Sequence, residues 1–79
     1  MAAADRVADV LAALGDLGLV SLVKFDGERE HKRWTVVITG RPLADGGVRV
    51  DGNTLDYCLD RALAAARTKL PTIPQFDHP

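Results

Sequence analysis

The spacing of the apolar residues changes twice along this chain, and that change limits the available folds more than any other feature. Near the N-terminus apolar residues recur every three or four positions, in the middle they alternate with polar ones, and toward the C-terminus the first spacing returns. The first spacing is typical of an amphipathic helix and the second of a strand with one covered face. The pattern therefore predicts a small α+β domain in which strands lie between two helices.

The two predicted helices span residues 3–14 and about 55–69. Gly15 and Gly18 are expected to end the first helix, and Asn53 or Thr54 to cap the second by accepting a hydrogen bond from a backbone amide. Arg6 and Asp9 fall on the polar side of the first helix. Its apolar face comprises Val7, Val10, Leu11 and Leu14. The apolar face of the second comprises Leu55, Cys58, Leu59, Ala62, Leu63, Ala66 and Leu70.

Three short segments are predicted as strands, at 19–25, 33–39 and 48–50. The first is an apolar run bounded by Gly18 and by the turn residues Asp26-Gly27, and the second alternates between apolar and polar positions. The short connection between them suits an antiparallel hairpin. A loop containing Pro42 leads into the third strand, which Asp51-Gly52 is expected to end.

The simplest arrangement places both helices on one face of the three-stranded antiparallel sheet, because each helix has a single apolar stripe to bury. The predicted architecture is α-β-β-β-α, with a single domain at 1–70 and an extended tail at 71–79, because Pro71 and Pro74 cannot continue a helix. Which side of the first strand faces the core stays undecided, because Val20 and Leu22 are also apolar. The covered face is expected to contain Trp34, Val36, Ile38, Val48, Val50 and, from the first strand, Leu19, Val23 and Phe25.

This order of elements, over roughly residues 3–70, resembles that of double-stranded-RNA-binding domains. The segment Asp51-Gly52-Asn53-Thr54-Leu55, followed by an alanine-rich helix, is similar to small proteins of actinobacteriophages, and its Gly-Asn-Thr-Leu start also resembles HicB-type antitoxins. The phage resemblance implies a phage-encoded protein in the host cytoplasm. RNA binding does not carry over, because acidic residues (Asp51, Asp56 and Asp60) stand where those domains use lysines to contact phosphate.

Charge and cysteine content exclude several classes of protein. The 79 residues include ten Lys and Arg against eleven Asp and Glu, a formal net charge of -1, which argues against a strongly basic nucleic-acid module. Cys58 is the single cysteine, so neither an intramolecular disulfide nor a multi-thiol metal site is possible. No apolar run is long enough to span a membrane, and a cytoplasmic location is expected.

The sequence contains no recognisable catalytic, cofactor or metal-binding motif. His31 and His78 have no ligand or nucleophile at a recognisable spacing and are expected to be exposed. Cys58 is expected to fill the core as a small apolar side chain, with Asp56 and Asp60 raising the pKa of its thiol. We therefore predict that the protein is not an enzyme, needs no cofactor and has no small-molecule substrate.

The uncovered face of the sheet is the one distinctive surface that the alternation predicts. It is expected to contain an apolar centre with a basic margin and no acid. Two interpretations stay open: the tail covers this face through Ile73 and Phe76, or a partner does. The candidate partner surface consists of Val20, Leu22, Lys24, Arg33, Thr35, Val37 and Arg49.

These features favour a non-enzymatic interaction protein that binds a protein partner or itself through the open sheet face and the tail. An edge strand offers a second route to a homodimer. The alternative is a nucleic-acid-binding module in which Lys24, Arg33 and Arg49, helped by Arg29 and Lys32, contact phosphates.

Overall fold

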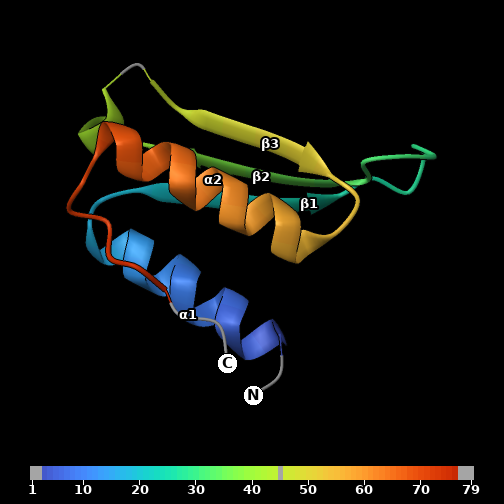
Figure 1. Cartoon of the computed structure of the whole chain (residues 1–79), viewed down its shortest axis with the longest axis horizontal. Coiled ribbons are helices and arrows are strands. Elements are labelled where there is room, and N and C mark those ends of the chain that lie inside the picture. The colour runs from blue at the N-terminus through green and yellow to red at the C-terminus, as the bar shows by residue number, and fades with distance from the viewer. Residues whose placement is uncertain (1–2, 45, 77–79) are drawn as a thin grey trace.

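A computed structural model describes residues 3–44 and 46–76 and confirms the α-β-β-β-α order (Figure 1). Its elements are α1 (Ala3–Asp16), β1 (Val20–Phe25), β2 (Trp34–Thr39), a short 3-10 helix (Arg41–Leu43), β3 (Val48–Gly52) and α2 (Leu55–Lys69). The strands form one antiparallel sheet in the order β1-β2-β3. Both helices lie on one side of this sheet, α2 across β2 and β3 and α1 beside β1 (Figure 1).

The ends of the helices follow from local hydrogen bonding. Helix α1 continues through Gly15 to Asp16, and Gly18 turns the chain with a φ of 82°, which favours glycine. The Leu19 amide donates to the Leu14 carbonyl over 3.1 Å and closes this end. At the start of α2, the Thr54 hydroxyl accepts a hydrogen bond from the Tyr57 amide over 3.1 Å, so Thr54 is the N-cap.

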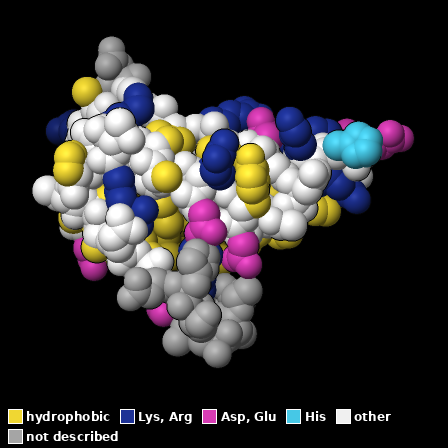
Figure 2. All heavy atoms as spheres, in the orientation of Figure 1, with side chains coloured by type: hydrophobic (Ala, Val, Ile, Leu, Met, Phe, Trp, Pro, Cys, Tyr) yellow, Lys and Arg dark blue, Asp and Glu magenta, His cyan; other side chains and the backbone are white. Residues whose placement is uncertain are grey.

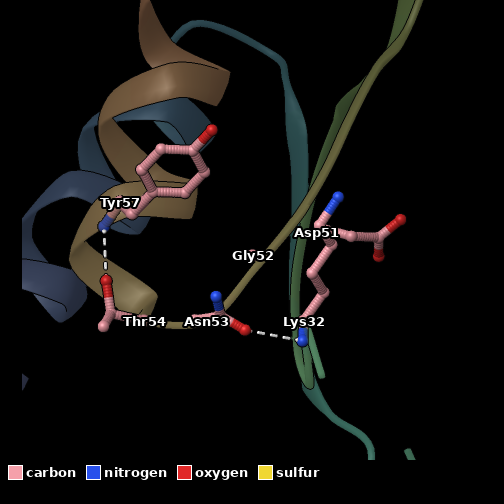
Figure 3. A pocket seen from close by; sticks show the side chains of 6 residues that line it. All are labelled: Lys32, Asp51, Gly52, Asn53, Thr54 and Tyr57. Atoms are coloured by element: carbon pink, nitrogen blue, oxygen red, sulfur yellow. Dashed lines mark hydrogen bonds between the residues drawn. The ribbon is translucent and has the colours of Figure 1, made fainter. Parts of the chain in front are cut away.

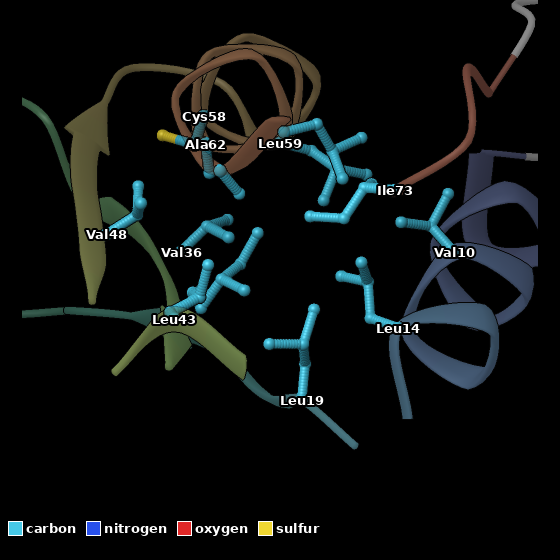
Figure 4. Close-up of a cluster of buried hydrophobic side chains, with 13 residues drawn as sticks. Val10, Leu14, Leu19, Val36, Leu43, Val48, Cys58, Leu59, Ala62 and Ile73 are labelled. Carbon is cyan, nitrogen blue, oxygen red and sulfur yellow. The ribbon is translucent and has the colours of Figure 1, made fainter. Parts of the chain in front are cut away.

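The core lies between the covered sheet face and the two helices (Figure 4). The predicted inward side chains Val36, Ile38 and Val48 are buried, and in β1 the inward set contains Val23. Phe25 was expected to be covered, but it is 50% exposed because it lies at the end of β1, beside the hairpin loop. Its ring contacts that of Trp34 edge to face, with centroids 4.8 Å apart.

The segment after α2 contributes to the same core. The chain turns at 71–73, where the Ile73 amide donates to the Leu70 carbonyl over 3.1 Å, and the Ile73 side chain is buried. Figure 4 shows this side chain between α2 and Val10 of α1. The interpretation in which Ile73 and Phe76 cover the open sheet face is therefore wrong: the core accepts Ile73 on the helix side, because the two helices leave an apolar gap there.

An ion-pair cluster joins the two helices. Arg6 was expected on an exposed polar side, but its side chain is only 7% exposed and its guanidinium donates to the carboxylates of Asp56, over 3.1 Å, and Asp60. Asp56 and Asp60 of α2 are thus ion-pair partners of α1. Pairing a mostly covered guanidinium with two carboxylates offsets part of its desolvation cost.

Candidate functional site on the open sheet face

The register of the strands fixes which side chains share the open face. In β1 and β2, Leu22 pairs with Val37 and Lys24 with Thr35. In β2 and β3, Val37 pairs with Arg49 and Thr35 with Asp51. Paired residues of an antiparallel sheet point to the same face. The structure therefore brings together six of the seven residues predicted for this face, namely Val20, Leu22, Lys24, Thr35, Val37 and Arg49.

One half of the open face is apolar and exposed. Val20 and Leu22 are 61% and 57% exposed, and Val37 lies half-buried opposite Leu22. The described residues after α2 pack on the helix side, so they leave these side chains uncovered. Neighbouring exposed aliphatic side chains on a flat sheet are a feature of interaction surfaces.

Arg33 was expected to contribute its charge to this face, but its side chain is engaged in the hairpin. Its guanidinium lies over the Phe25 ring, with the central carbon 4.7 Å from the ring centroid. It also donates to the carbonyls of Asp26 and Gly27 over 3.3 and 3.2 Å. Lys32, just before it, has a φ of 52°, which interrupts the strand alternation on which the prediction depended. Arg33 therefore holds the hairpin turn together.

Thr35 points toward the open face but is not available to a partner, since it is only 2% exposed. The Arg29 side chain folds back from the β1–β2 loop and donates to the Thr35 hydroxyl over 3.0 Å. It also donates to Asp26 over 3.1 Å and to Asp51 over 3.5 Å. This long-range contact between a loop and a strand leaves no periodic signal in the sequence.

Asp51 places an acid on the open face, so the expectation of an acid-free surface was wrong. The sequence predicts that the Asp-Gly pair ends the third strand, but β3 continues to Gly52 and keeps Asp51 on the same side as Arg49. Extending the alternation by one step would have found it. The Thr35 hydroxyl donates to the Asp51 carboxylate over 2.5 Å.

The polar end of the face therefore holds ionised carboxylates. The hydrogen bond from Thr35, followed by that of Arg49, lowers the pKa of Asp51 below its ordinary 3.8 despite some desolvation. The hydrogen bond from the Glu28 amide, followed by that of Arg29, lowers the pKa of Asp26 in the same way. The open face thus has an aliphatic half and a polar half whose side chains hydrogen-bond to one another.

A hollow of about 410 Å³ lies where β3 meets α2, lined by Lys32, Asp51, Gly52, Asn53, Thr54 and Tyr57 (Figure 3). The Asn53 side chain accepts a hydrogen bond from the Lys32 amide over 2.8 Å and so fixes one wall. Gly52 forms the floor, and no side chain fits there, because a Cβ atom would lie 2.6 Å from the Tyr57 ring and 2.8 Å from the Cys58 sulfur.

Cys58 and the two histidines are the remaining residues of types that catalysis or metal binding uses. Cys58 is buried as expected, and burial, with a smaller contribution from the charge of Asp51, raises the pKa of its thiol. His31 is exposed in the hairpin loop, and His78 lies outside the described residues. Among residues 3–44 and 46–76, no three His, Cys, Asp or Glu side chains are grouped to hold a metal ion.

No helix in the described part of the chain combines the length and the apolar character that crossing a bilayer requires. Comparison with known proteins gives no assignment, since no family model, curated protein or solved structure matches the chain. The resemblance to double-stranded-RNA-binding domains and to actinobacteriophage proteins therefore stays a prediction.

Proposed function

We propose that this chain is a non-enzymatic interaction protein that binds a protein partner or itself through the open face of its sheet. The observation that carries the proposal is the exposed aliphatic group formed by Val20, Leu22 and Val37. In a small domain, burying such a group against a second protein removes apolar surface from water and stabilises the complex.

The arrangement of charges around this group supports a protein partner. Lys24 lies toward one end and Arg49 pairs with Val37 on the other side, so a basic margin borders the aliphatic centre. Asp51 adds an acid to the same margin. A mixed polar rim around an apolar centre is the usual composition of a protein interface.

Nucleic-acid binding by the same face has less support. Arg29 and Arg33, which were expected to help contact phosphates, make hydrogen bonds within the hairpin and the adjoining strands. Asp51, with a lowered pKa, keeps a negative charge on the face near neutral pH. Lys24 and Arg49 alone give a smaller electrostatic footprint than phosphate recognition normally uses.

The test is the molar mass in solution by light scattering over a concentration series, for the wild type and for Val37→Glu and Leu22→Glu. An introduced carboxylate must be desolvated in any complex that covers this face, so each variant should weaken association by at least about tenfold. Ala12→Glu, on the exposed side of α1, is the matched control. Circular dichroism checks that every variant is folded.

If the wild type is a dimer, the proposal requires the two sheet variants, and not the control, to become monomeric. If the wild type is a monomer, it requires a partner that the wild type and Ala12→Glu capture and the sheet variants do not. Equal behaviour of all four proteins in both assays contradicts the assignment of the surface.

A further inference from the structure

The outer edge of β3 has no strand beside it. β3 is the last strand in the order β1-β2-β3, and within the described residues only β2 pairs with it. Every second residue of an edge strand directs its amide and carbonyl groups outward, where they can hydrogen-bond to an added strand. In Figure 1 this edge runs along the side of the sheet opposite β1.

A shallow hollow of about 560 Å³ accompanies that edge. One side is formed by residues 49–51 of β3, and the other by one stripe of α2 at helical spacing. Ala64 and Ala65 keep the helix wall recessed, because neither side chain extends beyond its Cβ. The residues of α2 in this stripe are Tyr57, Arg61, Ala64, Ala65 and Thr68.

The hollow adjoins the one drawn in Figure 3, because Asp51 and Tyr57 line both. An open edge and a recessed helix wall thus follow β3 from Arg49 to Gly52. We call the combined feature the β3–α2 groove, lined by Lys32, residues 49–54 and the α2 stripe.

The charge of this groove is mainly positive. The Arg49 side chain is 63% exposed, and the Arg61 guanidinium lies 5.5 Å from the centroid of the Tyr57 ring. Lys32 lies at the far end. Asp51 is the single acid among these lining residues, and its carboxylate bonds to Thr35 and Arg29 and lies 3.5 Å from the Arg49 guanidinium.

The surface view agrees with this description. Figure 2 has the orientation of Figure 1, and Lys and Arg side chains gather along the margin where β3 runs, with an acidic side chain among them. The acids at the start of α2 bond instead to Arg6 of α1, on the other flank of the helix. On the side of the molecule that Figure 2 shows, the margin beside β3 is therefore mainly basic.

We propose that the β3–α2 groove binds an extended acidic peptide segment as an additional strand on β3. Backbone hydrogen bonds to the β3 edge supply the alignment, and alternate side chains of the segment pack on Val50 and the recessed alanines. Carboxylates of the segment pair with Arg49 and Arg61. This binding site adjoins the open face and shares Arg49 with its margin, but it uses the edge of the sheet and the flank of α2 instead of the aliphatic side chains.

The proposal is tested with an array of immobilised hexapeptides that carry Glu at alternate positions and varied residues at the others. A matched array carries Lys in place of Glu. The full chain should bind members of the Glu array and not their Lys counterparts, because the groove discriminates by charge. The strongest peptide is then titrated into the labelled protein while the backbone amide NMR signals are followed.

Binding through the groove should shift signals of residues 48–52 and 57–68 and leave those of 20–24 in place. Ala64→Glu places a carboxylate in the groove, and its negative charge repels the acidic peptide. This variant should weaken peptide binding by about tenfold or more. Ala12→Glu, on the exposed side of α1, is the matched control and should bind as the wild type does. Because Ala64 is exposed, its substitution leaves the core unchanged.

Three results would overturn this inference. The first is no preference for Glu over Lys peptides, and the second is a set of shifts centred on β1. The third is a concentration-dependent dimer that Ala64→Glu converts to a monomer, which would show that the groove accepts a second copy of the chain instead.

Discussion

The two faces of the sheet carry similar aliphatic residues in alternation, yet their surroundings differ. On the covered face Val36 and Ile38 are fully buried against the helices, whereas Val20 and Leu22 on the open face are more than half exposed. The difference shows that an apolar side chain in a strand stabilises the fold only where another layer of structure removes it from water. The same residue types on the open face are free to bind another molecule.

The sharpest test of this comparison is a pair of substitutions to alanine, one on each face of the sheet. Ile38→Ala leaves a cavity in a closely packed core and should lower the free energy of unfolding by about 2–5 kcal/mol. Leu22→Ala removes a side chain that is mostly in water and should change it by no more than about 0.5 kcal/mol. Urea denaturation of the two variants measures the difference. Equal losses would mean that the open face is covered in the folded monomer.

Two glycines provide a second, smaller contrast. Gly52→Ala places a Cβ atom against the Tyr57 ring and the Cys58 sulfur and should cost about 1–3 kcal/mol of stability by overpacking. Gly15→Ala places one in open space within α1 and should stabilise the protein by up to about 1 kcal/mol through helix propensity. Thermal denaturation of both variants provides the comparison, and a stable Gly52→Ala protein would contradict the close contact between β3 and α2.

Thr35 is an exception on the open face, because its side chain is buried and its hydroxyl is hydrogen-bonded to polar neighbours. Thr35→Val removes the hydrogen bond that contributes most to lowering the pKa of Asp51, so this pKa should rise toward its ordinary value. Titration of the Asp51 carboxyl signal by NMR measures the shift, with Thr39→Val as the control. An unchanged pKa would show that the arginines, and not Thr35, hold the carboxylate.

The smallest expected effect is the acid dependence of stability. Because folding lowers the pKa of Asp51, its ionised form stabilises the fold above the ordinary pKa of 3.8. That contribution should be lost as the pH falls through the lower pKa of the folded state. Asp51→Asn should therefore flatten this part of the stability curve, measured by urea denaturation at stepwise lower pH. A curve of unchanged slope would assign the acid dependence to other carboxylates.

Much of the fold was predictable because it depends on local spacing. The element order, the buried positions of β2 and the inward role of Cys58 all follow from alternation or from three-to-four periodicity, and the structure confirms them. The candidate surface was predicted less completely. Its aliphatic members lie where expected, whereas Arg33 and Thr35 are engaged by neighbours whose contact no periodic pattern indicates.

The sequence by itself determined where helices and strands form and which side of each is apolar, because those properties depend on residues a few positions apart. Only the tertiary structure decided which charges remain available. Arg6 bonds across to α2, Arg29 folds over Thr35, and Ile73 enters the core between the helices. Each of these contacts joins distant segments and depends on how closely the layers pack, so the surfaces available to a partner were settled only when the chain had folded.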